Sequence, residues 1–196
     1  PIQGEWVEEQ NLEAEHLKES IQPFDKSELW DLAKRITNPY ERISTHSTRL
    51  VLPKSISCIY PLSRSYFKMI ELLTQLDFFE RHKEPRLKSL HICEGPGGFI
   101  QALSERCIQE HVTIEISLAM SLRPIHVQIP GWKRAYHFLR KSPMVHIEYG
   151  ADETGDIMVP VNQGAFLDKT RTKCHIFTAD GGFDFSEHYG TQEEEV

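Results

Sequence analysis

The sequence predicts an α/β fold with a mostly parallel sheet and helices on both of its faces. Short apolar segments that read as strands occupy residues 87–93, 112–118, 144–149 and 174–179. Helical patterns separate these segments, and unusual loops follow three of them, at 94–98, 150–156 and 180–184. Because ligands of parallel sheets bind beyond the carboxyl ends of the strands, we expect the three loops to share one site.

Length and composition bound the class of protein. The chain has 196 residues, of which 39% are hydrophobic, enough for the core of one domain with a small appendage. No apolar run approaches the roughly 20 residues that a membrane-spanning helix needs. The first ten residues are polar and acidic, which does not fit a signal peptide. We therefore expect an intracellular protein that does not enter a membrane.

The N-terminal third is predicted to be helical. Residues 5–21 read as a polar, weakly amphipathic helix. A capping-box pattern at 25–28 opens a second helix through Ile36, which the following Asn-Pro ends. Residues 44–62 read as a connecting segment. We treat residues 1–37 as a helical extension and residues 38–196 as the main domain.

Further helices are predicted between the strands. Apolar spacing indicates one helix from Arg64 to about Arg81, and others at 100–109, 132–141 and 160–168. In the third of these, Trp132 and Tyr136 are interpreted as core anchors of a basic amphipathic helix. The alternative is a platform on which an RNA cap stacks.

Cysteines and histidines give no sign of a metal site. The four cysteines, Cys58, Cys93, Cys107 and Cys174, stand far apart, so we expect buried free thiols in a reducing compartment. The ten histidines form no pair or cluster with metal-ligand spacing. We therefore predict that the protein needs no metal.

Charge is unevenly distributed along the chain. The net charge is −7, which by itself argues against a nucleic-acid partner. Acids gather in the first 25 residues and at 193–195, whereas bases gather at 81–88, 133–141 and 169–173. A local basic face is compatible with this pattern, although composition does not place one.

A glycine-rich loop follows the first strand. Residues 94–99 read Glu-Gly-Pro-Gly-Gly-Phe, and glycines allow tight turns and close approach of a ligand. The spacing is neither that of a dinucleotide-binding loop nor that of a P-loop. Such a motif is an ordinary turn in many proteins, but its place between a strand and a helix makes it a candidate cofactor loop.

Three ordered motifs carry a resemblance to a known family. The stretches SRSYFKMIEL (63–72), CEGPGGF (93–99) and TADGGFDFS (178–186) resemble the FtsJ-type ribose methyltransferases. The stretches at 130–133 and 148–157 are similar to the cap-specific members from large cytoplasmic DNA viruses and eukaryotes. The resemblance covers roughly residues 38–195. It implies a Rossmann-like methyltransferase fold and, if the source is viral, a place in the cytoplasm of an infected host cell.

The resemblance also implies a Lys-Asp-Lys-Glu tetrad, of which Lys68 and Asp180 match the first two members. By this resemblance, Lys68 would orient the ribose hydroxyl. Asp180 would position the ammonium group of Lys68 and would favour the positive charge of the methyl-donating cofactor. The second Lys and the Glu come from strands further downstream, so residues 1–196 are expected not to catalyse alone. Without the motifs, Lys68 would read as a solvated helix residue and Asp180 as a turn former.

The cofactor implied by the resemblance is S-adenosylmethionine. It would be bound by Glu94, Gly95, Pro96, Gly97, Gly98, Phe99, Asp152 and Asp156. Asp152 would accept a hydrogen bond from the adenine amino group, although Asp152 and Asp156 also suit simple loop caps. An acid at the end of the second strand, which often binds the cofactor ribose in this family, is not evident.

The resulting prediction is methylation of the RNA ribose 2′-hydroxyl, with capped mRNA as the expected substrate. Three alternatives stay open: a ribosomal or transfer RNA methyltransferase, a catalytically silent module that binds RNA or protein, and, more distantly, a nicotinamide oxidoreductase. A protein partner is expected at the acidic N-terminal helices or at an exposed edge of the sheet.

Overall fold

The computed structural model describes residues 12–13, 16–17, 19–20, 22–24, 28–37, 57, 59–125, 129, 131–170 and 173–181. The chain divides into two units, one of residues 1–59 with 182–196 and one of residues 60–181. In the first unit, the described members of 5–21 are helical, a 3-10 turn spans Gln22–Phe24, and α2 spans Glu28–Thr37. The predicted second helix is thus confirmed, whereas its capping residues 25–27 lie outside the described part.

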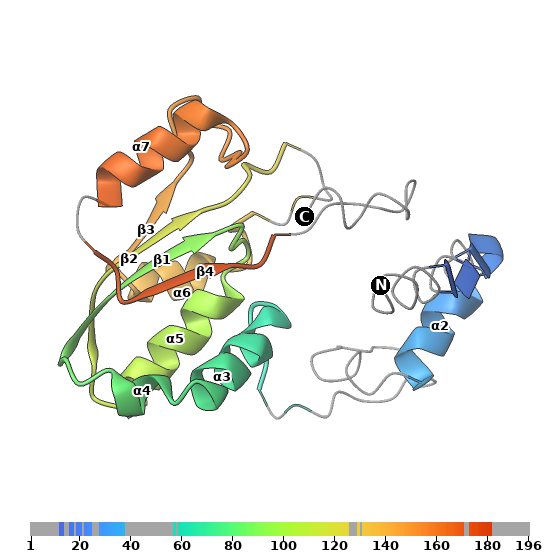
Figure 1. The fold of residues 1–196 in the computed structure, drawn as a ribbon, viewed down its shortest axis with the longest axis horizontal. Coiled ribbons are helices and arrows are strands. Elements are labelled where there is room, and N and C mark those ends of the chain that lie inside the picture. Colours follow the sequence, from blue (N-terminus) through green and yellow to red (C-terminus); the bar gives the residue numbers. More distant parts are fainter. Residues whose placement is uncertain are drawn as a thin grey trace, which may run out of the picture. The chain divides into compact units, whose positions relative to one another are not determined.

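The second unit contains a four-stranded parallel sheet in the order β3-β2-β1-β4 (Figure 1). Its strands are β1 (Arg86–Ile92), β2 (Thr113–Met120), β3 (Val145–Glu148) and β4 (Ile176–Ala179). Between them run α5 (Gly98–Gln109), α6 (Tyr136–Lys141) and α7 (Pro160–Thr170). All four predicted strands and the parallel α/β class are confirmed.

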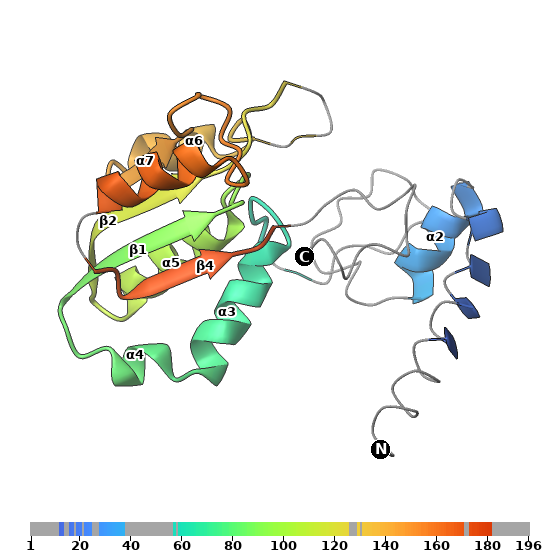
Figure 2. The ribbon, with the colours of Figure 1, turned by 45° about the horizontal axis from the view of Figure 1, so that its top comes forward.

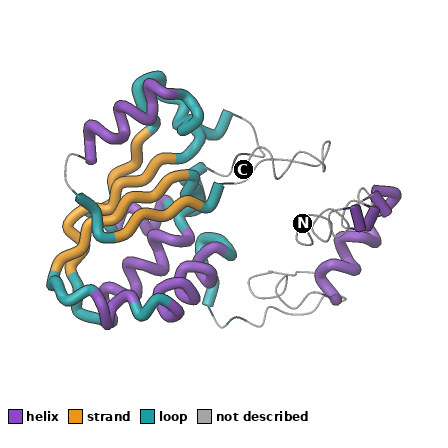
Figure 3. Tube along the Cα trace, in the orientation of Figure 1, coloured by secondary structure: helices purple, strands orange, loops and turns teal. Residues whose placement is uncertain are grey.

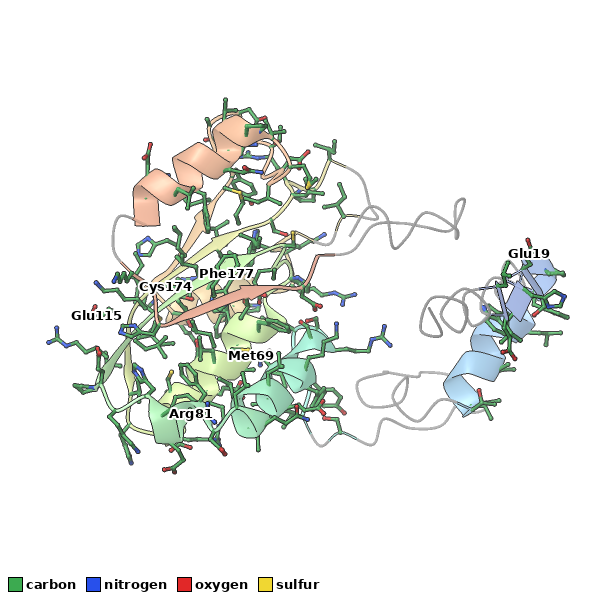
Figure 4. The ribbon with its side chains drawn as sticks, in the orientation of Figure 1. Glu19, Met69, Arg81, Glu115, Cys174 and Phe177 are labelled. Carbon is green, nitrogen blue, oxygen red and sulfur yellow. The ribbon has the colours of Figure 1, made fainter. Side chains whose placement is uncertain are left out.

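Helices cover both faces of the sheet (Figures 1 and 2). One face packs against α5, α6 and α3 (Ser65–Gln75), and the other packs against α7. The first face carries two clusters of buried side chains, centred on Met69, Leu87 and Leu103 and on Ile100, Ala119 and Trp132. Figure 4 labels Met69 on α3 and Phe177 on β4, whose side chain is exposed on the face that α7 covers only in part.

Strand order places a switch point at β1. The chain moves from β1 to β2 and β3, then returns through α7 to place β4 on the other side of β1. Crevices at such points are where open α/β sheets bind ligands, because neighbouring loops diverge there. Figure 3 shows the loops that follow the strands gathered at one edge of the sheet.

A buried polar chain links three of the strands. Ser117 Oγ lies 2.7 Å from Ser89 Oγ, which lies 2.9 Å from His91 Nε2. The other ring nitrogen, Nδ1, lies 2.6 Å from Thr178 Oγ1 on β4. Burial lowers the pKa of His91 to about 3, so the ring is neutral and donates one hydrogen bond while it accepts the other.

Two predicted helices differ from the structure. The helix expected over 64–81 is broken into α3 and α4 (Phe78–Arg81), because Asp77 adopts a left-handed conformation with φ 49°. The helix expected over 132–141 begins only at Tyr136, after turns that follow Gly131 with φ 48°. Trp132 is a core anchor as predicted, but Tyr136 is 56% exposed, so the prediction of a buried Tyr136 is wrong.

The described cysteines are free thiols. Cys107 is a buried free thiol as predicted, whereas Cys93 and Cys174 are free and only half-buried; Cys58 lies outside the described part. None of the described helices is both long enough and apolar enough to cross a bilayer.

Gly98 is where α3 and α5 approach each other, and replacing it tests this packing. A Cβ atom there would lie 2.2 Å from the Oγ atoms of Ser63 and Ser65 and 2.8 Å from the Tyr66 nitrogen. We expect Gly98→Ala to destabilise the protein by about 1–3 kcal/mol, measured by denaturant unfolding. Gly164 on α7 is the matched control, because a Cβ there meets nothing within 4 Å. Gly164→Ala should be neutral or stabilising by about 0.5–1 kcal/mol. Equal effects of the two changes would contradict the close helix contact.

Candidate active site

Loops after β1, β2 and β3 form one connected surface at the carboxyl edge of the sheet. Ser121 Oγ, directly after β2, accepts a hydrogen bond from Gly95 N at 3.0 Å. Arg123 N donates to Thr154 O at 2.7 Å, which joins the second loop to the third. Gly155, with φ 74°, lies so close to the second loop that a Cβ would be 2.0 Å from Ser121 O. Of the three loops predicted to converge, 94–98 and 150–156 are joined through the loop after β2, whereas residues 182–184 of the third lie outside the described part.

The glycine loop turns sharply between β1 and α5. Gly97 N donates to Glu94 O at 2.7 Å, and Gly97 adopts φ 107°, which side chains other than glycine rarely accept. A Cβ on Gly97 would point toward Leu62, Trp132 and Ala135 beneath the loop. The loop therefore lies over a packed apolar support, with Gly97 buried and Gly95 and Pro96 partly exposed.

Glu94 is a buried carboxyl at the start of this loop. Its Oε1 accepts a hydrogen bond from Ile100 N at 3.0 Å, and Phe99 N also donates to the side chain. Burial raises the pKa of Glu94 to about 8, against the effect of both N–H groups, and the negative charge of Asp180 raises it further. Glu94 thus ties the first turn of α5 to the loop, largely as a neutral acid at pH 7.

Lys68 and Asp180 form an ion pair between residues far apart in the sequence. Lys68 Nζ lies 2.7 Å from Asp180 Oδ1, and their side chains are 63% and 29% exposed. Alternation along β4 directs Ile176, Thr178 and Asp180 toward the face that α3 covers. The sequence-predicted pair is therefore brought together at the end of β4.

Hydrogen bonds to α5 from α3 and from the turn before it fix the position of Lys68. Tyr66 OH donates to Glu105 Oε2 at 2.6 Å, and Leu62 N donates to Gln101 Oε1 at 2.8 Å. Burial and the Glu105 carboxylate raise the pKa of Tyr66 to about 12, so the phenol remains a donor. These bonds hold the first turn of α3, and with it Lys68, against α5.

Asp152 and Asp156 lie in the loop after β3. Asp152 Oδ1 accepts hydrogen bonds from Thr154 N, Thr154 Oγ1 and Asn162 Nδ2, at 2.7–2.9 Å. These bonds hold the pKa of Asp152 below its usual value. Asp156 Oδ1 accepts from Met158 N at 2.9 Å. One oxygen of each carboxylate therefore shapes the loop, as the loop-cap alternative expects, and a binding role would fall to the other oxygen.

Two carboxylates, those of Asp156 and Asp180, lie near Cys93. Burial raises the pKa of the Cys93 thiol, and the charges of Asp156 and Asp180 raise it further. Gly181 approaches the same residue, since a Cβ there would lie 3.2 Å from Cys93 Sγ. The ends of β1 and β4 and the loop after β3 thus meet in a region of negative potential, which suits a cationic ligand.

Some residues of this surface were not identified from the sequence. Asn162 is fully buried, and its amide group bonds Asp152, Thr154 and Asp156 O, so it organises the third loop from α7. The Arg123 guanidinium lies 4.2 Å from the centre of the Tyr149 ring and pairs with Glu153 at 2.6 Å. Neither has a local sequence motif. Among the described residues, no group of three or more His, Cys, Asp or Glu side chains could hold a metal ion.

Comparison with known proteins identifies the family. The model of the FtsJ-like methyltransferases matches residues 61–195, which is more than half of the chain. The chain belongs to the FtsJ-like methyltransferase family. Its motifs at 63–72, 93–99 and 178–186 all fall within the matched region.

Two curated relatives have related names. The chain is 29% identical over 174 residues to cap-specific mRNA (nucleoside-2′-O-)-methyltransferase 2 of Mus musculus, and 28% identical over 175 residues to the protein of that name from Pongo abelii. Each match covers 86% of this chain and 22% of the relative, so the chain spans about a fifth of the relatives' length. No solved structure matches significantly.

Glu94 should make stability depend on pH in a defined direction. Its pKa of about 8 in the folded protein lies above the ordinary value, so the unfolded chain loses this proton first as pH rises. Folding stability should therefore fall between about pH 5 and pH 8. Glu94→Gln keeps an oxygen to accept from Ile100 N but cannot ionise. We expect thermal unfolding to show the variant gaining about 2–4 kcal/mol on the wild type over that pH range. A pH-independent difference would contradict the buried, protonated carboxyl.

Proposed function

We propose that this chain carries the cofactor-binding part of an enzyme that transfers a methyl group from S-adenosylmethionine to the 2′-hydroxyl of an RNA ribose. The observation that carries the proposal is the pair of Lys68 and Asp180, 2.7 Å apart, beside the glycine loop in a chain of the FtsJ-like family. A surface ion pair of this kind contributes only about 0–1 kcal/mol to folding stability, so a contribution to stability does not explain why the two residues are paired.

The donor set at the strand ends fits S-adenosylmethionine. The partly exposed backbone at Gly95 and Pro96 would approach the cofactor closely, and the second oxygen of Asp152 would accept from the adenine amino group. Asp156 and Asp180 favour a positive charge in the space beside Cys93. When bound, S-adenosylmethionine supplies a methyl group on a cationic sulfur.

Lys68 and Asp180 would act on the acceptor hydroxyl. Asp180 holds the Lys68 ammonium in one place, and that ammonium can donate a hydrogen bond to the ribose oxygen. The hydroxyl oxygen would form its bond to the methyl carbon as the bond from sulfur breaks, and its proton would pass to the second Lys of the tetrad that the resemblance implies. This division agrees with the orienting role that the resemblance gives to Lys68.

Capped mRNA is the proposed substrate because both curated relatives are named cap-specific mRNA methyltransferases. Methylation of other RNA is the second candidate within the same chemistry, and transfer to capped and uncapped RNA of one sequence distinguishes them. An intracellular location belongs to the same proposal. Both relatives are mammalian proteins, and a viral source stays a prediction that the sequence motifs alone support.

Binding of the cofactor can be tested through Asp152. Asp152→Asn keeps the oxygen that accepts from Thr154 and Asn162, and it replaces the second oxygen with an amide donor. A donor facing the adenine amino group should lower affinity for S-adenosylmethionine by about 10- to 100-fold in calorimetric titration. Glu153→Gln is the matched control and should change affinity little. Wild-type affinity in Asp152→Asn would reject the adenine contact, and no binding by the wild type would reject the cofactor.

Methyl transfer tests the ion pair. In the complete gene product, Lys68→Ala and Asp180→Ala should each lower transfer to capped RNA by about 100-fold or more, while cofactor affinity changes much less. The reason is that both groups are proposed to act on the reacting hydroxyl. Glu71→Ala, an exposed change on the same helix, is the control. Near-normal transfer by either active-site variant would show that its assigned role is wrong.

A further inference from the structure

The surface of α6 carries a group of Lys and Arg residues that form no ion pair with the described residues. No Asp or Glu occurs between Glu115 and Glu148, whereas five Lys or Arg residues do. Four of the five lie in α6 or the turn before it: Lys133, Arg134, Arg140 and Lys141. All four are exposed, and none forms an ion pair within the described part of the chain. The fifth, Arg123, does pair, with Glu153.

A pocket with aromatic lining lies among these basic residues. Its volume is about 690 Å³, and it is lined by Trp132, Lys133, Tyr136, His137, Leu139 and Arg140. Tyr136 is 56% exposed, and the Arg140 guanidinium lies 5.7 Å from the centre of its ring. Trp132 is buried, and its indole N–H has no acceptor among the described residues. The pocket therefore offers an exposed aromatic ring and the cations of Lys133 and Arg140.

This pocket adjoins the candidate active site. Trp132 supports the glycine loop, since a Cβ on Gly97 would lie 3.5 Å from its ring, and Gly131 O lies beside Gly95. Moreover, α6 and α3 cover the same face of the sheet. Asp180 follows β4, whereas α6 packs over β2 and β3, so two to three strand spacings, about 10–15 Å, separate them.

We infer that the α6 surface, formed by Lys133, Arg134, Tyr136, His137, Arg140 and Lys141, binds the single-stranded RNA that flanks the reacting nucleotide. The Lys and Arg side chains would contact phosphates, and a nucleobase would stack on the ring of Tyr136. This inference rests on the proposed function, because that function brings RNA to the adjoining site. An acidic peptide would match the charge, but it would leave the exposed aromatic ring and the pocket without a role.

The test measures binding of fluorescent single-stranded RNA to the full chain by anisotropy. In Lys133→Glu/Arg140→Glu, affinity should fall by at least about 10-fold at about 0.1 M salt, and the salt dependence should weaken by about two phosphate contacts. Tyr136→Ala should also lower affinity, but with an unchanged salt dependence, because it removes stacking rather than charge.

Arg81→Glu/Lys83→Glu is the matched control. It makes the same change in charge at α4 and the turn before β1, at the amino end of the sheet. It should alter RNA affinity by less than about 3-fold, as expected for distant charges that salt screens. An equal loss of RNA affinity in the two double variants would show that only net charge matters. That result would overturn the inference that the α6 surface binds RNA.

Cofactor binding separates this inference from the proposed function. All variants should keep the wild-type unfolding temperature and affinity for S-adenosylmethionine. If the wild type binds the cofactor and RNA, but the α6 variants bind RNA equally well, the surface is wrong and the proposed function stands. If the wild type binds the cofactor and an acidic peptide but not RNA, the RNA substrate and this surface are both overturned.

Discussion

The close approach of α3 to α5 at Gly98 is the contact on which the candidate site depends. Any larger residue there would collide with Ser63, Ser65 and the backbone of Tyr66. With the two helices in contact, Tyr66 reaches Glu105, and the core around Met69, Leu73 and Leu103 closes. Lys68 lies in this first part of α3. Its place over the end of β4 is therefore a consequence of helix packing rather than of the ion pair itself.

The other half of the ion pair depends on the register of β4. Ile92 stands opposite Ala179, so both strands end together at the edge where Glu94 and Asp180 follow. The buried bond between His91 and Thr178 fixes that register, because a slip of one residue would leave a neutral, buried imidazole without its partner. The same slip would turn Asp180 to the opposite face of the sheet, away from Lys68. The polar chain through the sheet thus specifies the site at a distance from it.

Much of the fold could be predicted from the sequence, because strands, helices and loops leave local patterns. Four apolar segments and the loops that follow them were enough for a parallel sheet with one site at its carboxyl edge. The strand order was not accessible, since it depends on contacts between distant segments. The break at Asp77 and the late start of α6 after Gly131 were missed for a similar reason: an apolar periodicity continues through both places, and only the backbone conformation shows the interruption.

The candidate site could be predicted only through its motifs. Nothing local links Lys68 with Asp180, which are 112 residues apart. The family motifs predicted both residues, and the structure shows that their side chains form an ion pair. Conversely, Asn162 carries no motif, although it anchors the loop that contains Asp152 and Asp156. A buried amide reveals itself only when the groups around it are known.

Electrostatics divides the carboxyl edge of this acidic protein into two regions. The charges of Asp156 and Asp180 both raise the pKa of Cys93, and the charge of Asp180 also raises the pKa of Glu94. On the same face, over β2 and β3, α6 and its preceding turn carry four Lys or Arg residues and no Asp or Glu. A cation is thus favoured at the strand ends over β1 and β4, and an anion is favoured over β2 and β3. Under the proposed function, the cationic methyl donor and the polyanionic acceptor would each meet a region of matching charge, and a net charge of −7 does not prevent this, because the potential at such distances follows the nearest charges.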